Sequence, residues 1–246
     1  MDLPNVQGYV VSMEQQVALF EVVQAVITLQ PGHHASAEFF AKSLFFMSVG
    51  SNDIFDHHDY NETTVSQPEL MAALQSNYTA QLTALYDLGA WKFGIVSVPP
   101  IGCCPYARLQ NLKANRSGCF AELNNYARSF HSMISALLQN LSSQLQGMVY
   151  SLGDAYTMTS TLMDDHLAVG IDNIEEACCG RGTLNAEKPC FTNDIPNLCP
   201  NRSDHLFWDM FHLTEYVAQK AAITLFTGGP TFVALMNFSQ LAWASA

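Results

Sequence analysis

The chain has 246 residues, of which 49% are hydrophobic and only 13% are charged, so it can bury a substantial core and is not disordered. Its 10 basic and 22 acidic residues give a net charge of −12. That balance argues against nucleic acid or an anionic membrane surface as a partner, because both need a basic patch.

The apolar pattern along the chain alternates between helices and short strands. Residues 13–27 have helical spacing that Pro31 and Gly32 end, and residues 43–49 form a nearly all-apolar strand before Gly50. The following predicted elements are a helix over 71–85, a strand over 93–98, a helix over 118–145 and a strand over 148–152. Residues 154–202 are expected to be irregular, and a last helix begins near Thr214. This order predicts an α/β fold with a parallel sheet and crossover helices.

Neither end of the chain has the pattern of a membrane or export segment. Residues 1–4 lack the basic and apolar regions of a signal peptide, and the apolar residues 221–246 are interrupted at Gly228, Gly229, Pro230 and Asn237. We therefore expect no transmembrane segment.

Two features nevertheless indicate the secretory pathway. Five of the seven cysteines lie beyond residue 118, which suits a protein with disulfides. Asn-x-Ser/Thr glycosylation sequons occur at Asn61, Asn77, Asn115, Asn140, Asn201 and Asn237. Coincidental sequons and free buried thiols are the alternative. A secreted type of sequence without a leader predicts that an N-terminal segment is missing.

The first group of candidate site residues is Gly50-Ser51-Asn52-Asp53, directly after a buried strand. In a parallel sheet, chemistry gathers at the carboxyl ends of the strands. The N–H of Gly50 and the side-chain N–H of Asn52 can converge as the two donors of an oxyanion hole. Asn and Asp after a strand are also common turn formers, so this group alone decides little.

The second group is Phe207-Trp208-Asp209-Met210-Phe211-His212, just before the last predicted helix. An Asp three residues before a His can accept a hydrogen bond from its Nδ1, which leaves Nε2 as a general base. A single Asp–His pair is as often a structural contact.

Taken together, these groups and three others make the chain resemble the plant GDSL esterases/lipases, members of the SGNH hydrolase superfamily. The matching blocks follow in the family's order: SLFFMSVGSNDIFD (43–56), VPPIGCCP (98–105), CFAELNNYARSFHSMI (119–134), EACCGRG (176–182) and CPNRSDHLFWDMFHLTEYVAQ (199–219). The resemblance starts at about residue 13. It implies one domain over residues 1–246 with a three-layer α/β/α, flavodoxin-like fold.

The resemblance also assigns roles. Gly50 and Asn52 correspond to the oxyanion-hole residues, and Asp209 and His212 to the catalytic Asp and His. The implied reaction is hydrolysis of a small-molecule or lipid carboxylic ester through an acyl-enzyme, without metal or cofactor. Secretion fits the family. The ester, the oligomeric state and the disulfide pairing stay open.

The expected nucleophile is what the sequence lacks. The family uses a serine in an N-terminal Gly-Asp-Ser-Leu block, and neither that block nor a G-x-S-x-G elbow occurs here. Four serines can be considered as replacement nucleophiles, but none is placed where a nucleophile is expected: Ser12 precedes a helix, Ser51 lies between the two oxyanion donors, and Ser48 and Ser97 lie in predicted strands. We therefore expect an N-terminally truncated fold without its first strands, with an apolar edge at residues 43–49 and little or no esterase activity. Leu213 replaces the proline that usually follows the histidine, so we expect His212 to be held less firmly.

Three other interpretations remain. His33-His34 and His57-His58-Asp59 are adjacent pairs in predicted loops, which makes a metal site the weaker interpretation. Cys103-Cys104 and Cys178-Cys179 are neighbours rather than C-x-x-C pairs, so we expect one member of each to bridge elsewhere. We expect a set of aromatic side chains to pack in the core and line a pocket, or alternatively to form a groove for an acyl chain: Phe45, Phe46, Phe207, Trp208 and Phe211. The alternative function is a secreted, non-catalytic binding protein on the same scaffold.

Overall fold

The computed structural model describes residues 10–29, 33–61, 64–190 and 197–244. Its elements in chain order include the helices α1 (Met13–Leu29), α2 (His33–Lys42), α3 (Ser51–Asp56), α4 (Gln67–Asp87), α5 (Pro105–Lys113), α6 (Ala121–Gln144), α7 (Ala155–Asp164), α8 (Glu215–Thr227) and α9 (Phe238–Trp243). The strands are β1 (Leu44–Met47), β2 (Lys92–Val96), β3 (Val149–Gly153), β4 (Asn173–Ala177), β5 (Cys179–Gly180), β6 (Asn197–Leu198), β7 (His205–Phe207) and β8 (Val233–Ala234). A π-helical turn, His57–Asn61, follows α3.

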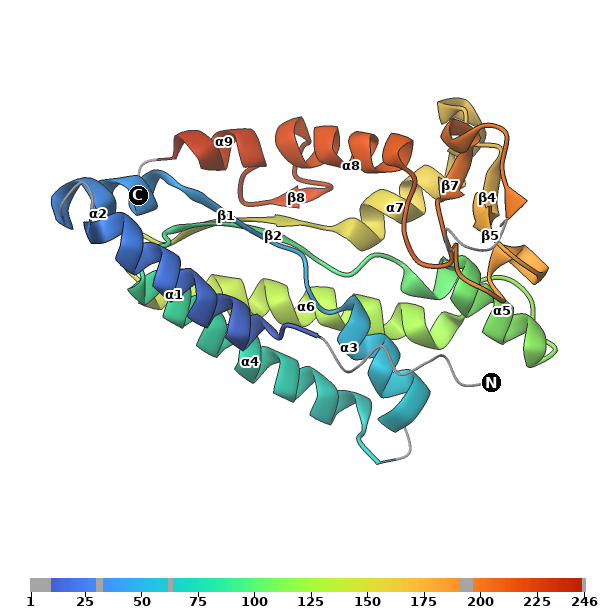
Figure 1. The fold of residues 1–246 in the computed structure, drawn as a ribbon, viewed down its shortest axis with the longest axis horizontal. Helices are drawn as coiled ribbons and strands as arrows, with labels where there is room; N and C mark the ends of the chain where they lie inside the picture. Colours follow the sequence, from blue (N-terminus) through green and yellow to red (C-terminus); the bar gives the residue numbers. More distant parts are fainter. Residues whose placement is uncertain (1–9, 30–32, 62–63, 191–196, 245–246) are drawn as a thin grey trace.

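The central sheet has the strand order β1-β2-β3-β8, and it lies between two layers of helices (Figure 1). β1, β2 and β3 are parallel, as expected, with Met47 beside Ile95 and Val96 beside Gly153. β8 was not predicted and pairs antiparallel with β3. Two small sheets, β4-β7 and β5-β6, lie at the other end of the molecule from α2. The mixed α/β architecture with a mostly parallel sheet confirms the three-layer α/β/α prediction.

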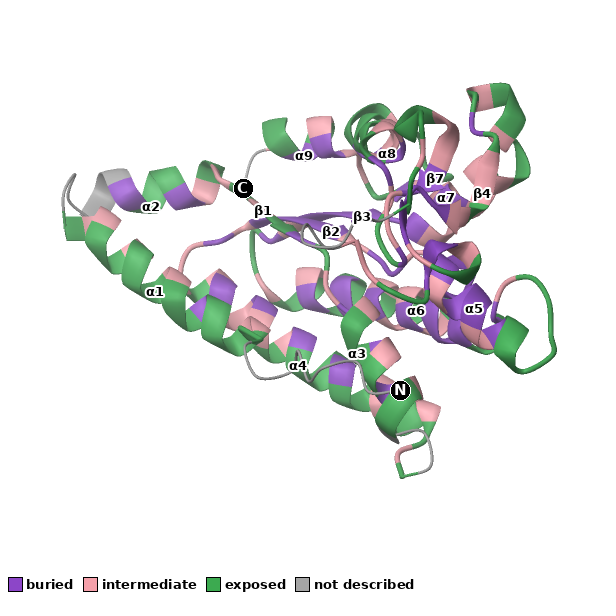
Figure 2. Cartoon of the chain, turned by 45° about the vertical axis from the view of Figure 1, so that its right-hand side comes forward, coloured by how far each residue is buried: buried purple, intermediate pink, exposed green. Residues whose placement is uncertain are grey.

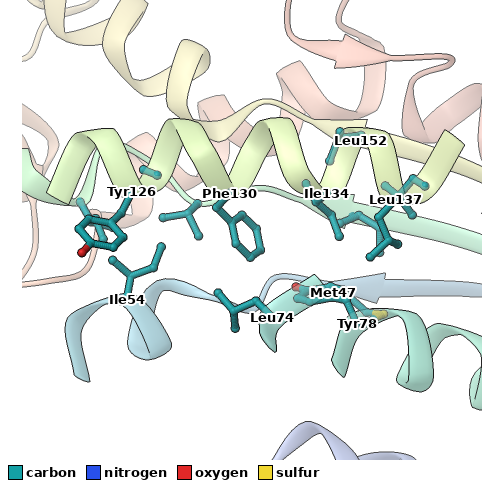
Figure 3. Close-up of a cluster of buried hydrophobic side chains, with 14 of the residues drawn as sticks. Met47, Ile54, Leu74, Tyr78, Tyr126, Phe130, Ile134, Leu137 and Leu152 are labelled. Carbon is teal, nitrogen blue, oxygen red and sulfur yellow. The ribbon is translucent and has the colours of Figure 1, made fainter. Parts of the chain in front are cut away.

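The core lies between the sheet and the helices α4 and α6 (Figure 3). α6 is amphipathic, and its inward residues at helical spacing are fully or almost fully buried. Phe130 and Ile134 of α6 pack toward Met47, Leu74 and Ile54, from the strand β1 and the helices α4 and α3. Figure 2 shows buried residues concentrated on the central strands and on the inner side of α6. This packing fixes β1, and therefore the turn that follows it.

Local signals explain where the predicted elements begin and end. α4 begins at a capping box in which Ser66 and Glu69 bond to each other's backbone N–H, with Pro68 in the first turn. It ends before Gly89, whose φ of 98° requires glycine. The strands β1, β2 and β3 lie within a residue or two of their predicted ranges.

Several predictions about the C-terminal half and the histidines were wrong. Residues 154–202 are not irregular throughout, because they contain α7 and the strands β4, β5 and β6. The helix that begins at Glu215 is not the last, because α9 follows it. The two histidine pairs do not lie in loops: His33-His34 starts α2 and His57-His58 starts the π-helical turn.

Candidate active site

Gly50 makes the turn from β1 into α3 and sits in a space that only glycine fits. Its φ is 129°, a conformation that residues with a side chain rarely adopt. A Cβ at this position would lie 2.8 Å from two ring carbons of Phe130 and 3.2 Å from Val98. The turn is therefore pressed against the buried side of α6.

Ser51, Asn52 and Asp53 form the first turn of α3, directly after the turn at Gly50. The first N–H groups of a helix have no partner within the helix, and they give its N-terminus a positive character. Asn52 is exposed and Ser51 is half-buried, so the amide of Asn52 is open to a ligand at this end of the sheet. These donors suit an oxygen with developing negative charge.

Asp209 and His212 form the pair that their spacing predicts. Nδ1 of His212 lies 2.9 Å from each carboxylate oxygen of Asp209. Because an ionised carboxylate only accepts hydrogen bonds, Nδ1 carries the proton and Nε2 has a free lone pair. The side chain of His212 is 75% exposed, whereas Asp209 is largely covered. Among the described residues, the only side chain that bonds to His212 is Asp209, so Nε2 is open.

The loop that carries this pair is fixed by its own backbone. Asp209 Oδ1 also accepts the N–H groups of Phe211 at 2.9 Å and His212 at 2.7 Å. Trp208 donates its N–H to the carbonyl of His212, and Phe207 forms a bridge with Leu213. This bridge sets the direction of the chain into α8. We expected His212 to be held less firmly because Leu213 replaces a proline, and the bridge is a contact that Leu213 makes in its place.

Three aromatic rings connect this loop to α3 and α5. The rings of Phe55 and Phe211 are 5.5 Å apart, and the ring of Tyr106 lies 5.9 Å from Phe55 and 4.9 Å from Phe211. The hydroxyl of Tyr106 donates to Asp59 at 2.8 Å. Burial, together with this hydrogen bond, raises the pKa of Tyr106. The cluster brings the helix that starts at Ser51 and the His212 loop to the same end of the sheet.

The sequence did not predict this aromatic cluster. Of the five aromatic residues expected to form core and pocket lining or an acyl-chain groove, only Phe211 belongs to this cluster. Phe45 and Phe207 pack in or against the main core, as the first of these interpretations predicts. Phe46 is 58% exposed at the edge of the sheet, so a single groove formed by all five is not observed. Phe55 and Tyr106 come from different motifs, and only the folded chain brings them together.

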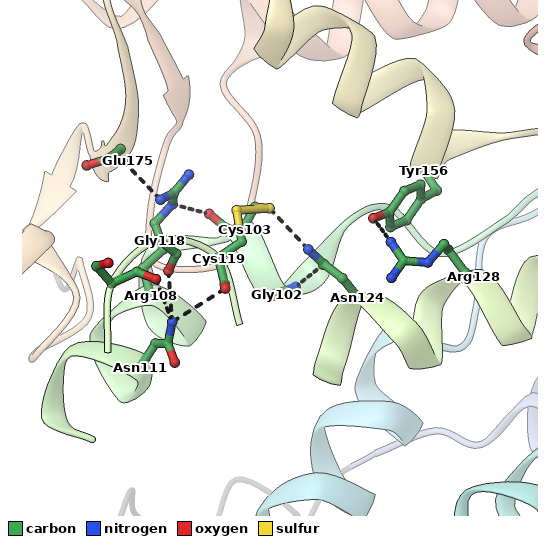
Figure 4. The surroundings of a disulfide bond; sticks show 11 residues. Gly102, Cys103, Arg108, Asn111, Gly118, Cys119, Asn124, Arg128, Tyr156 and Glu175 are labelled. Atoms are coloured by element: carbon green, nitrogen blue, oxygen red, sulfur yellow. Dashed lines mark hydrogen bonds and ion pairs between the residues drawn. A yellow bond between two sulfur atoms is a disulfide. The ribbon is translucent and has the colours of Figure 1, made fainter. Parts of the chain in front are cut away.

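Three disulfides lie among the described residues, and Figure 4 shows the surroundings of one of them. Cys103–Cys119 closes the segment that contains α5, beside Asn124, which accepts the N–H of Gly102 at 2.8 Å. The buried Arg108 joins this segment to β4 through the Cys103 carbonyl and Glu175. The two other bonds are Cys178–Cys199 and Cys179–Cys190.

The cysteine-rich segment also supports the loop of His212. The N–H groups of Cys178 and Cys179 donate to the carbonyls of Phe207 and Trp208 at 2.9 and 2.8 Å. The expectation that one member of each vicinal pair bridges elsewhere holds for Cys103, with Cys104 free and buried. It was wrong for the second pair, because both of its members bridge.

None of the serines considered as a nucleophile contacts His212. Ser12 caps α1 by accepting the N–H of Gln15, and Ser97 is buried and accepts the N–H of Ala155. Ser48 lies just past β1 and is exposed, and Ser51 is in the first turn of α3. In the part of the chain that the structure describes, no serine hydroxyl bonds to the imidazole.

The histidines once considered for a metal have other partners. Nε2 of the buried His57 lies 3.1 Å from the hydroxyl of Tyr126, and Nδ1 of His58 lies 3.0 Å from Asp59. The side chains of His33 and His34 lie outside the described residues. Within the described residues, no group of three or more His, Cys, Asp or Glu side chains is arranged to hold a metal ion.

Comparison with known proteins places these features in a family. The family model described as GDSL-like Lipase/Acylhydrolase matches residues 5–225. We expected the match to start at about residue 13, and it starts earlier. In Arabidopsis thaliana, GDSL esterase/lipase At1g33811 is 32% identical over 219 residues, which cover 83% of this chain and 57% of the relative. GDSL esterase/lipase At1g71691 is 31% identical over 248 residues, which cover 98% of this chain and 63% of the relative.

This chain thus spans about three-fifths of the length of the curated relatives that it matches. The family match covers the turn at Gly50, the Asp209–His212 pair and all three disulfides. The chain belongs to the GDSL-like lipase/acylhydrolase family.

Proposed function

We propose that this chain carries part of the active site of a carboxylic-ester hydrolase, with His212 as general base, Asp209 as the residue that orients it, and Gly50 and Asn52 as oxyanion donors. The observation that carries the proposal is the bidentate contact of Asp209 with Nδ1 of an exposed His212. The names of the relatives, which are esterases or lipases, support the same reaction class.

The mechanism follows from the imidazole of His212, whose Nδ1 is bonded to Asp209 and whose Nε2 is open. A serine attacks the ester carbonyl while Nε2 of His212 takes the proton of its hydroxyl, and the tetrahedral oxyanion accepts hydrogen bonds from the turn at Gly50. The imidazolium then returns the proton to the leaving alcohol, and water hydrolyses the acyl-enzyme by the same route. The described residues offer no serine placed for this attack, so we expect the 246-residue chain to be weakly active or inactive on its own.

The test is the hydrolysis of p-nitrophenyl acetate and butyrate by the 246-residue chain and by a longer product of the same gene, if one is expressed. In the active form, His212→Ala should lower kcat by at least about a thousand-fold, and Asp209→Asn by up to about ten-thousand-fold. His205→Ala is the matched control, because His205 also bonds to an adjacent carboxylate, Asp204, at 2.5 Å. Hydrolysis that His212→Ala leaves unchanged would overturn these roles.

A fluorophosphonate probe separates this function from a non-catalytic binding protein. The probe reacts only with a serine that a general base activates. Labelling of the active form that disappears in His212→Ala supports the enzyme. If neither form is labelled and neither hydrolyses esters, the binding-protein alternative is favoured.

We further propose that the protein is secreted and glycosylated, and that residues 1–246 form one domain. Three disulfides favour an oxidising compartment. Four of the six sequon asparagines are exposed, namely Asn77, Asn115, Asn140 and Asn201. The side chain of Asn61 lies outside the described residues. No helix among the described residues is long and apolar enough to span a membrane.

A further inference from the structure

Tyr106, in the first turn of α5, holds the loop that carries His212 in two ways. Its backbone N–H donates to the carbonyl of Met210 at 3.1 Å. The centroid of its ring lies 4.9 Å from that of the Phe211 ring. Tyr106 therefore contacts both of the residues that directly precede His212.

The side chain of Tyr106 also joins the two apolar clusters of the molecule. It packs against the main core, and it packs against the small cluster formed by Leu109, Ala186 and Met210. Among the described residues, it is the one side chain that lies against both clusters. Tyr106 therefore connects Met210, the buried residue of the His212 loop, with the main core.

The hydroxyl end of Tyr106 is fixed by the π-helical turn that follows α3. Its O–H donates to Oδ2 of Asp59 at 2.8 Å, and Oδ1 of Asp59 lies 3.0 Å from Nδ1 of His58. The side chains of His58 and Asp59 are only 15% and 23% exposed. The buried His57 anchors the turn on α6, because its Nε2 lies 3.1 Å from the hydroxyl of Tyr126. Turns of this kind are uncommon and are frequent at functional sites.

Phe55 extends the contact to α3, the helix whose first turn carries the proposed oxyanion donors. Its ring lies 5.9 Å from that of Tyr106 and 5.5 Å from that of Phe211. The Asp209–His212 pair, by contrast, is closed within its own loop. Contacts inside the loop keep the pair together, but contacts between the loop and its neighbours set where the pair lies relative to α3. Tyr106 makes such contacts with both its backbone and its ring.

We propose that Tyr106 is a positioning residue, which Asp59 anchors and which sets the place of the His212 imidazole relative to the oxyanion donors. The phenol is not itself a general base, because burial and the bond to Asp59 raise the pKa of Tyr106 and keep its hydroxyl protonated at neutral pH. The catalytic consequence rests on the proposed function, whereas the docking of the loop does not.

The first test measures the order of the His212 loop by NMR relaxation in the 246-residue chain, and it needs no ester hydrolysis. Tyr106→Leu removes the ring. We expect the backbone order parameters of residues 210–212 to fall from the ~0.85 of a rigid backbone to below about 0.6, while those of α6 stay unchanged. The imidazole should keep its proton on Nδ1, read from its nitrogen shifts, because Asp209 moves with the same loop.

Two milder variants separate positioning from folding. Tyr106→Phe keeps the ring and loses the bond to Asp59, and Asp59→Ala removes the same bond from the other side. Both should loosen residues 210–212 in the same direction as Tyr106→Leu, by a smaller amount. Tyr86→Phe is the matched control, because that phenol donates to the carbonyl of Gln146 and its loss should leave the loop unchanged.

In the active form, positioning predicts a change in kcat rather than in KM. A displacement of about 1 Å can lower a rate about a hundred-fold, so we expect a decrease of this size in kcat for p-nitrophenyl butyrate in Tyr106→Leu. Tyr106→Phe should lower kcat roughly two- to ten-fold, the equivalent of one hydrogen bond. KM should stay within about two-fold in both variants, because uniform binding of the ester is unchanged.

The proposal is overturned if residues 210–212 stay as ordered as in the wild type in a folded Tyr106→Leu protein. If that protein does not fold, the same result in Tyr106→Phe and Asp59→Ala overturns it. Equal loosening of α6 also overturns it, because the ring would then stabilise the whole fold. An active form that keeps its kcat in Tyr106→Leu contradicts the proposal and leaves the ester hydrolase standing. A loosened loop in a protein that hydrolyses no ester in any form supports the docking and counts against the proposed function.

Discussion

Gly50 combines two separate constraints, a positive φ and a close contact with Phe130. We predict that Gly50→Ala destabilises the protein by more than the ~1–3 kcal/mol that backbone strain of this kind costs, because the new Cβ also overlaps the Phe130 ring. Urea unfolding followed by circular dichroism measures the effect. Gly170→Ala is the control, because Gly170 has a φ of 78° and nothing within 4 Å of its added Cβ. Equal decreases in the free energy of unfolding of the two variants would show that the contact with Phe130 does not contribute.

Cys104 is the one free cysteine among the described residues, and its surroundings make it unreactive. Burial raises the pKa of this thiol to about 12. At pH 8, roughly one thiol in ten thousand would then be the reactive thiolate. We predict that iodoacetamide leaves the native protein unmodified and alkylates one cysteine, Cys104, after unfolding without reductant. Rapid labelling of the native protein at pH 8 would contradict this prediction.

At the scale of single residues, the sequence predicted pairs that are close along the chain. Asp209 and His212 are three residues apart, so a loop brings them together and the expected hydrogen bond is present. Their catalytic roles stay a prediction. The contacts of Phe55 with Tyr106 and Phe211 depend on how three segments pack, and no local pattern indicates them.

Among the elements, α9 depends on the residue just before it, the N-cap Asn237, for both its cap and its contact with the end of α8. Asn237 accepts the N–H of Gln240 at 2.9 Å and donates its Nδ2 to the carbonyl of Gly228 at 3.3 Å. A glycan would replace a hydrogen of that same nitrogen. We predict that Asn237 stays unglycosylated although it heads a sequon, whereas the exposed Asn77 is open to the modification.

Mass spectrometry of tryptic glycopeptides from a plant expression host compares the two sites. Asn237→Ala should cost about 1 kcal/mol of stability through loss of the cap, without changing the mass of attached sugar. A glycan found at Asn237 in the folded protein would show that the cap is not formed during maturation.

The elements that the sequence predicted are those with a long or strongly apolar pattern, such as α6 and β2. Shorter helices were missed because isolated short helices are marginal and form through tertiary packing. α7 has Ser and Thr at several positions, and its start depends on Asp154, which accepts the N–H of Thr157. α9 has only six residues and is held by packing of Phe238 on Gly94 and by the buried Lys92, which donates to the carbonyl of Ala242.

In the whole molecule, the disulfides are confined to one end, whereas the large apolar core extends through both. The large apolar core joins β1, β2 and β3 to α4 and α6 and contains no disulfide. The disulfides lie around α5, β4, β5 and β7, where strands are short and the core cluster is small (Figure 1). The covalent bonds thus add to apolar burial at the end that carries the Asp209–His212 pair.

This division predicts how the protein responds to a reductant. The three bonds close segments of 16, 21 and 11 residues, and a loop of about 15 residues contributes roughly 3 kcal/mol. We expect dithiothreitol to increase hydrogen exchange over residues 173–190 and 197–213, while the amides of α4, α6 and β2 stay protected. The Cys104→Ser variant should respond like the wild type, because its thiol is in no disulfide. If exchange rises equally in α6 and in the cysteine-rich segment, the sheet core is not stable without the disulfides. The two ends of the molecule would then unfold as one unit.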